Sequence, residues 1–332
     1  MNQTENALVL ARSIGGKNGL NCIAELDETA EEQAKAQEAD KRDRLLEGIP
    51  VLVKDNIDVK GLHTTAGSLA LADNIAREDA PVIMNLRRNG AVILGKTNMT
   101  EFANFTTEKM PGGYSSRGGQ VIHAVNPKLS PAGSSSGSAV AVAAGIVPMA
   151  VGTDTSHSVT GCAMFNGICG LKPPAGTLSA EGIIPIARTL DSAGAMARNL
   201  TDTLKLYSAM RDEPLPELKP LRMEGLRIAV NRAQWETLQE SRKCFLNNLL
   251  KKLKAGGAIT GEVVQGAAPE MVTIMRWEFR PMLEDYLEKS SAERRTLAEI
   301  VAYYVGDGRP NRLIGLGRVL CSTERFRFIT RS

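Results

Sequence analysis

The sequence contains few of the residues that build metal centres and disulfide-bonded folds. Its three histidines, His63, His123 and His157, are too dispersed to predict a metal site. The five cysteines are scattered and odd in number, which argues against a disulfide framework or paired zinc ligands and favours a reduced cytoplasm. No apolar stretch approaches about 18 residues, the length that suggests a membrane span. The N-terminus lacks the charged start and apolar run of a signal peptide. These absences predict a cytoplasmic protein with no metal and no membrane span.

The sequence also lacks a large excess of charge of either sign. Its 332 residues include 40 basic and 37 acidic side chains, which gives a formal net charge of +3. No basic stripe stands out, so nucleic acid is not an expected partner. With 43% hydrophobic residues, the chain can bury a large core, either as one large α/β domain or as two smaller ones.

Two serine-rich segments stand close together in the middle of the chain. The first is Ser134–Ser138, and the second contains Ser156 and Ser158. Small residues at 139–144 predict a helix between them, and Met149–Val151 predicts a short buried strand. Two hydroxyl-rich loops on either side of one helix could bring two serines together. Nucleophilic catalysis requires such an arrangement, provided that a base is near.

A candidate base lies upstream, at Lys54. The apolar run Pro50–Val53 is too short for a helix and predicts a buried strand, at whose end Lys54 would be partly desolvated. Burial disfavours an ammonium group, so such a lysine can be neutral near neutral pH and accept a proton. The alternative is a surface lysine that follows an edge strand.

Several motifs in order resemble those of the amidase signature family. The similarity extends from about Asn21 to about Gly306, and its three main motifs are PVLVKDNI (50–57), GSSSGS (133–138) and GTDTSHS (152–158), the last followed by GLKP (170–173). The segments GYSSRGG (113–119), SPAGSSSG (130–137) and GIIPI (182–186) resemble the branch that includes peptide amidases. The resemblance implies an α/β fold with a mixed, largely parallel central sheet flanked by helices.

The resemblance also implies a catalytic triad of Lys54, Ser134 and Ser158. Ser158 matches the nucleophile, Ser134 the bridging serine that follows a cis peptide bond, and Lys54 the base. The oxyanion hole would be formed by the backbone N–H groups of Thr155, Ser156, His157 and Ser158. The implied activity is hydrolysis of a small-molecule or peptide amide through an acyl-enzyme, without a metal or a cofactor.

The resemblance favours a single amidase-like domain over residues 1–332. Its core would span 21–210, a helical part on the substrate side would span 211–307, and the remainder, 308–332, would be a divergent tail. The Gly- and Ser-rich loop 110–126 carries Tyr114 and Arg117, which could face the substrate, although packing within a surface loop is the alternative.

Three departures from the family pattern bear on activity. The family usually has Gly at the position of His157, so His157 would distort the oxyanion hole or fill it if that position needs backbone angles reserved for Gly. The alternative is a tolerated substitution that leaves the backbone unchanged. Thr160, Gly161 and Cys162 stand where Arg, a hydrophobic residue and Pro are common. Members also typically continue for a hundred or more residues, so a truncated member is expected. A non-catalytic relic of the fold is therefore the alternative to an amidase.

Two shorter motifs suggest other enzymes. Residues 90–97 match the P-loop pattern GxxxxGK[ST], but their AVIL core predicts a strand rather than a phosphate-binding loop. A helix opening with Asp79 at its cap is predicted before that strand, and a helix around Glu101–Phe105, capped by Thr97 or Asn98, after it. Residues 133–137 match GxSxG, but an α/β-hydrolase needs a later acid and histidine, and the only later histidine is His157.

Overall fold

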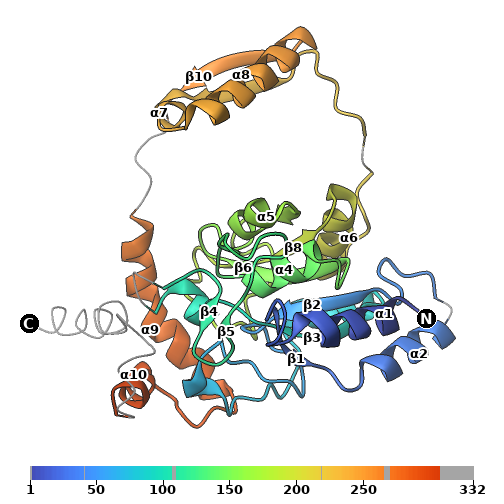
Figure 1. Cartoon of the computed structure of the whole chain (residues 1–332), viewed down its shortest axis with the longest axis vertical. Coiled ribbons are helices and arrows are strands. Elements are labelled where there is room, and N and C mark those ends of the chain that lie inside the picture. Colours follow the sequence, from blue (N-terminus) through green and yellow to red (C-terminus); the bar gives the residue numbers. More distant parts are fainter. Residues whose placement is uncertain (1, 41, 107–109, 218, 265–269, 307–332) are drawn as a thin grey trace, which may run out of the picture. The chain divides into compact units, whose positions relative to one another are not determined.

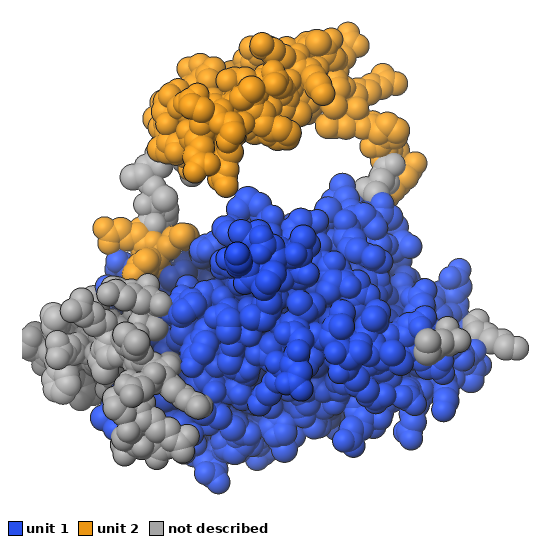
Figure 2. All heavy atoms as spheres, in the orientation of Figure 1, with its two compact units in different colours: residues 1–215, 273–332 blue, residues 216–272 orange. Residues whose placement is uncertain are grey.

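The computed structural model describes residues 2–306 except 41, 107–109, 218 and 265–269. The chain divides into two compact units, residues 1–215 with 273–332, and residues 216–272 (Figure 2). The predicted single domain stays a prediction, and the predicted tail at 308–332 lies outside the described residues. Among the helices in the described ranges, none has the length and apolar character needed to cross a membrane.

The first unit is built around a six-stranded sheet in the order β1-β3-β2-β6-β8-β7 (Figure 1). Its strands are β1 (Ile23–Leu26), β2 (Pro50–Lys54), β3 (Val92–Thr97), β6 (Met149–Asp154), β7 (Cys169–Leu171) and β8 (Ser192–Ala197). β3, β2 and β6 are parallel, β1 and β8 are antiparallel to their neighbours, and β7 is antiparallel to β8. Four of the six strands therefore run in one direction, which confirms the predicted mixed, largely parallel sheet.

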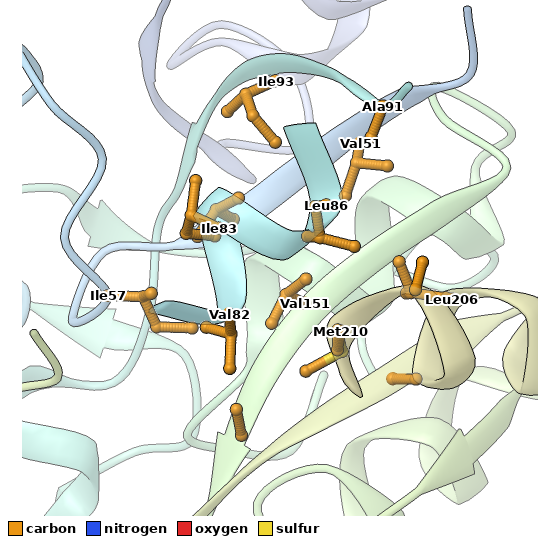
Figure 3. Close-up of a cluster of buried hydrophobic side chains, with 14 of the residues drawn as sticks. Val51, Ile57, Val82, Ile83, Leu86, Ala91, Ile93, Val151, Leu206 and Met210 are labelled. Carbon is orange, nitrogen blue, oxygen red and sulfur yellow. The ribbon is translucent and has the colours of Figure 1, made fainter. Parts of the chain in front are cut away.

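Helices cover both faces of this sheet. They are α1 (Gln3–Leu10), α2 (Ala30–Asp40), α3 (Pro81–Arg88), α4 (Ser136–Ala143), α5 (Thr160–Asn166) and α6 (Leu200–Arg211). Successive side chains of a strand point to opposite faces. Accordingly, Val51 and Val53 of β2 pack in a cluster with residues of α3 and α6, whereas Leu52 packs in a cluster with residues of α1, α2 and α4. Figure 3 shows Val51 and Val151 in the first of these clusters. Burial on both faces explains why β2 is a continuous apolar run.

The strand β3 contains the residues of the P-loop pattern. Gly95, Lys96 and Thr97 are its last three residues, so the P-loop interpretation of 90–97 is wrong. Lys96 is fully buried, and its ammonium group donates hydrogen bonds to the carbonyl oxygens of Ile57 and His63 at 2.6 and 2.9 Å. The ammonium group of Lys96 therefore binds the protein's own backbone and is not available to a phosphate.

The helix α3 begins at Pro81, close to the predicted position, but its N-cap residue is Ala80 rather than Asp79. The carboxylate of Asp79 instead accepts a hydrogen bond from the backbone N–H of Lys60 at 2.8 Å and pairs with Arg87 at 2.8 Å. The cap prediction was therefore wrong, because ion pairing with the last turn of the helix offers this carboxylate a better partner than the first turn.

Two C-terminal helices, α9 (Met271–Lys289) and α10 (Leu297–Gly306), contribute to a third apolar cluster. The ring of Phe279 lies edge-on to Phe102 and Phe105, with centroids 6.2 and 5.0 Å away. The segment around Glu101–Phe105 is a short 3-10 turn with Thr100 at its cap, so the predicted cap at Thr97 or Asn98 is wrong. Phe102 has a positive φ of 44°, which an ordinary helix would not contain, and this backbone turns the ring toward Phe279.

The predicted loop 110–126 contains a short hairpin of β4 (Tyr114–Ser115) and β5 (Gly119–Gln120). The second unit contains β9 (Arg227–Asn231), α7 (Arg232–Glu236), α8 (Glu240–Ala255) and β10 (Ile259–Val263). Its two strands are parallel, and α8 connects them as the crossover that a parallel pair requires.

Candidate active site

Lys54 lies at the carboxyl end of β2, next to the parallel strand β6. Its side chain is fully buried, so the alternative of a surface lysine is wrong. The Nζ atom lies 2.8 Å from the Oγ atom of Ser134 and 2.7 Å from Oγ1 of Thr153, and 3.2 Å from the carbonyl oxygen of Thr153. The amide of Asn56 donates to the same threonine hydroxyl at 3.0 Å, which fixes its orientation.

Burial lowers the pKa of Lys54 to about 8, because the charged form loses its hydration. The nearby groups of Cys162, Asp154 and Asp191 act in the opposite direction and raise this pKa, but they do not offset the burial. A large fraction of Lys54 is therefore neutral in mildly alkaline solution. In that state the amine can accept the proton of the Ser134 hydroxyl group.

Ser134 follows a cis peptide bond after Gly133 and is fully buried. Its carbonyl oxygen accepts a hydrogen bond from the N–H of Thr100 at 3.1 Å. The serine-rich loop packs tightly on β6, since a Cβ atom on Gly152 would lie only 2.7 Å from the Oγ atom of Ser135. Glycine at 152 is therefore required for the close approach that presents Ser134 to Lys54.

Ser158 lies in the loop that joins β6 to α5, beside the serine-rich loop. Its carbonyl oxygen accepts a hydrogen bond from the N–H of Ser135 at 3.4 Å, so the two serine segments meet one residue after Ser134. The carboxylate of Asp154 holds the far side of this loop by accepting from the N–H groups of Val159 and Thr160 at 2.8 and 3.2 Å. Ser158 is 7% exposed, and its hydroxyl group makes no hydrogen bond with any described residue.

The same loop presents backbone donors without partners. None of the four N–H groups from Thr155 to Ser158 donates a hydrogen bond within the described part of the chain. Thr155 is held from the side, because its hydroxyl group donates to Asp191 at 2.6 Å and its carbonyl oxygen accepts from Lys172 at 3.2 Å. Successive unpartnered N–H groups favour a negatively charged atom in front of them.

His157 is exposed, and its backbone φ angle is not positive. The position therefore does not require glycine, and the histidine occupies it without left-handed backbone. Its Nδ1 atom lies 2.9 Å from the Oγ atom of Ser156.

A cavity of about 870 Å³ lies beside Thr153 and Thr155, a volume typical of small-molecule sites. Both threonines line it, whereas Lys54, Ser134 and Ser158 are not among its lining residues. Apolar side chains of the segment 183–186 form part of the wall. A polar part of the wall contains Asp58, which accepts a hydrogen bond from the hydroxyl group of Tyr286 at 2.7 Å.

Comparison with known proteins identifies the family of this chain. The model of the Amidase family matches residues 7–302. The chain belongs to the Amidase family. A probable amidase of Arabidopsis thaliana is 34% identical over 289 residues, which cover 78% of this chain and 55% of that protein.

Two solved amidase structures are similar over almost the whole chain. An amidase family protein from Bacillus anthracis str. Ames has a TM-score of 0.88 and 31% identity, and the match covers 98% of this chain and 70% of that one. The native peptide amidase from Stenotrophomonas maltophilia has a TM-score of 0.84 and 33% identity, covering 98% and 72%. This Amidase-family chain spans about half the length of the curated relatives that it matches.

The two residues of this Amidase-family chain that were predicted to face the substrate, Tyr114 and Arg117, do not line the cavity. Arg117 pairs with the buried carboxylate of Asp55 at 3.2 Å and approaches Glu25 at 3.9 Å. Tyr114 is half-buried in β4. Their role in substrate binding stays a prediction.

Sequence reasoning missed three polar residues at this site: Asn56, Thr153 and Asp191. Thr153 lies within the motif that contains Ser158, and its position at the end of a buried strand was the available signal. Asp191 lies 36 residues beyond Thr155, to which it is hydrogen-bonded, so only the folded chain reveals that contact.

Proposed function

We propose that this protein is an amidase that hydrolyses a carboxamide C–N bond through an acyl-enzyme on Ser158. The observation that carries the proposal is the 2.8 Å contact between the buried amine of Lys54 and the hydroxyl group of Ser134. Membership of the Amidase family and the nearby loop with four unpartnered N–H groups support it.

In the proposed reaction, neutral Lys54 accepts the proton of Ser134, and Ser134 accepts the proton of Ser158 as that oxygen attacks the carbonyl carbon. The new C–O bond leaves negative charge on the carbonyl oxygen, which the N–H groups of residues 155–158 stabilise. The C–N bond then breaks, and Ser134 returns a proton to the departing nitrogen. Water releases the acid by the same proton transfers, and Ser158 recovers its proton.

The proposed substrate is a small or peptide amide bound in the cavity beside Thr153 and Thr155. The similarity to a peptide amidase supports this class, as does a cavity that combines apolar walls with hydrogen-bonding groups. No cofactor is part of the proposal, because the two serines and the lysine supply every proton transfer that the reaction needs.

Covalent labelling tests the nucleophile directly. Incubation with a fluorophosphonate should add the mass of one phosphonyl group to the intact protein, and Ser158→Ala should abolish this addition. Lys54→Met should slow labelling strongly, because the proton acceptor is lost. Met164→Ala, a change at an exposed position of α5, serves as the matched control. A label that is absent, or that persists in Ser158→Ala, would count against the proposal.

A catalytically impaired member of the family is the second candidate, and the exposed imidazole of His157 beside Ser158 is the observation that favours it. Ammonia release by wild type and by His157→Gly separates the two. Activity that appears only in the variant favours the impaired member, whereas activity in wild type favours the amidase.

A further inference from the structure

The imidazole of His157 lies against the first turn of α5. A Cβ atom built on Gly161 would lie 3.0 Å from Cδ2 of His157 and 3.5 Å from its Cβ atom. The N–H of Gly161 also donates to the carbonyl oxygen of His157 at 2.7 Å. The ring therefore occupies the space next to residue 161 that a side chain at that position would need.

The loop that carries Ser158 has few other restraints. Its N–H groups from Thr155 to Ser158 make no hydrogen bonds within the described ranges, so backbone pairing does not hold them. Asp154 holds the residues that follow, at Val159 and Thr160. At the other end of the loop, Asp191 and Lys172 hold Thr155. Between these two ends, at residues 156 and 157, the side-chain restraints are the 2.9 Å contact between Ser156 and His157 and the packing of the ring on Gly161.

We propose that His157 is a positioning residue for the oxyanion loop and that His157 and Gly161 form a matched pair. The ring is held at Nδ1 by the Ser156 hydroxyl group and at its carbon edge by the bare backbone of Gly161. It thereby fixes the direction of the N–H groups on both sides of it. This inference rests on the proposed function, since it assigns a role in stabilising the charge that develops in the reaction.

Removal of the ring should loosen the loop without unfolding the protein. His157→Gly deletes both restraints and adds backbone freedom, so the N–H groups would no longer be held in place. A misplacement of about 1 Å can reduce catalysis about 100-fold, and we expect a loss of about 10- to 100-fold in kcat. KM should change less than about twofold, because the interaction concerns charge that is present only in the transition state.

The pairing with Gly161 predicts that the effect of Gly161→Ala on kcat depends on the residue at position 157. In wild type, Gly161→Ala places a methyl group 3.0 Å from the ring, so the ring must give way by a few tenths of an ångström. This displacement disturbs the contact of the ring with Ser156, and kcat should fall. In the His157→Gly background the same methyl group meets no ring. There it should leave kcat unchanged or raise it, since alanine favours the helix.

The experiment is a double-mutant cycle of wild type, His157→Gly, Gly161→Ala and the double variant. For each protein, kcat and KM are measured on one amide. Binding of a boronic acid that forms a tetrahedral adduct is measured as well. Binding of the boronic acid should weaken in parallel with kcat. His157→Gln, which keeps an acceptor for Ser156 and much of the bulk, should recover most of the loss. Met164→Ala again controls for changes in α5.

The outcomes separate this inference from the proposed function. Absence of Ser158-dependent turnover in wild type overturns the proposed function and the catalytic role of His157 with it. Normal turnover in wild type together with a kcat in His157→Gly within twofold of it, or with purely additive effects of the two substitutions, overturns this inference alone.

Discussion

The lowered pKa of Lys54 predicts how the reaction rate depends on pH. Burial moves this pKa from 10.5 to about 8, which corresponds to a loss of about 3 kcal/mol in the stability of the charged form. If the neutral amine is the base, about one tenth of the protein is competent at pH 7 and about nine tenths at pH 9. The value of kcat/KM should therefore rise about tenfold over this range and then level off.

The assay is the initial rate of ammonia release at low substrate concentration between pH 6 and pH 10.

A second perturbation tests the cause of the shift in the pKa of Lys54. The negative charge of Asp191 raises the pKa of Lys54, so Asp191→Asn should lower it and move the rising limb to lower pH. Glu236→Gln, at an exposed position in the second unit, is the control that should leave the limb unchanged.

Two results would refute this reasoning. A wild-type profile that is flat between pH 7 and pH 9, or that rises only near pH 10.5, would show that Lys54 is not a desolvated base. A limb that stays in place or moves upward in Asp191→Asn would show that the charge of Asp191 does not act on Lys54.

Three further predictions concern stability. Phe279→Ala should lower the free energy of unfolding in urea by about 3–5 kcal/mol, because it removes a fully buried ring from the third apolar cluster. Lys96→Met should lower the free energy of unfolding by about 3 kcal/mol, because it leaves the buried partners of the Lys96 ammonium group without a donor. ATP should not raise the melting temperature of wild type, because that ammonium group is not available to a phosphate. Tyr304→Phe removes a hydrogen bond to the buried carboxyl of Glu101 and should cost about 1–3 kcal/mol. Burial raises the pKa of Glu101 in the folded protein above its pKa in the unfolded chain. The stability that this difference contributes is fully present below the pKa of the unfolded chain and is lost as pH rises through the pKa of the folded protein. The hydrogen bond from Tyr304 acts in the opposite direction to burial, because it favours the charged carboxylate and lowers the pKa of Glu101. The cost of Tyr304→Phe should therefore grow as pH rises through the pKa of Glu101 in the folded protein.

Exposed positions on α9 provide controls for Phe279→Ala and Lys96→Met. Trp277→Ala, which removes a ring that is 61% exposed on α9, should cost much less than Phe279→Ala. Lys289→Met changes an exposed lysine of the same helix and should cost less than Lys96→Met. Equal losses within either pair, stabilisation by ATP, or an effect of Tyr304→Phe that shrinks as pH rises would contradict the respective prediction.

Local patterns in the sequence were sufficient for the elements closest to the site. The apolar run before Lys54 is strand β2, and the small residues after Ser134 form most of α4. The strand β8, by contrast, has the sequence SAGAMA, which carries no strand signal. It is a strand because it pairs with β6 on one side and β7 on the other, and such pairing outweighs the weak preference of its residues.

The side chains around the site could be predicted only in part. The motifs indicated Lys54, Ser134 and Ser158, but nothing in the sequence indicated that Thr153 would share the lysine amine or that His157 would pack on Gly161. These contacts depend on side-chain direction at the ends of elements. Motif spacing carries little information about that direction, because one change of rotamer moves an atom by several ångströms.

The sequence by itself determined which chemical groups are available and the order in which they follow along the chain, including the family to which its motifs belong. Only the tertiary structure decided that Lys54 is buried, since its partners lie 80 and 99 residues away at Ser134 and Thr153. The physical reason is that backbone preferences act over a few neighbouring residues, whereas desolvation depends on every segment packed around the amine. The amine of Lys54 has a pKa suited to a base because of that packing.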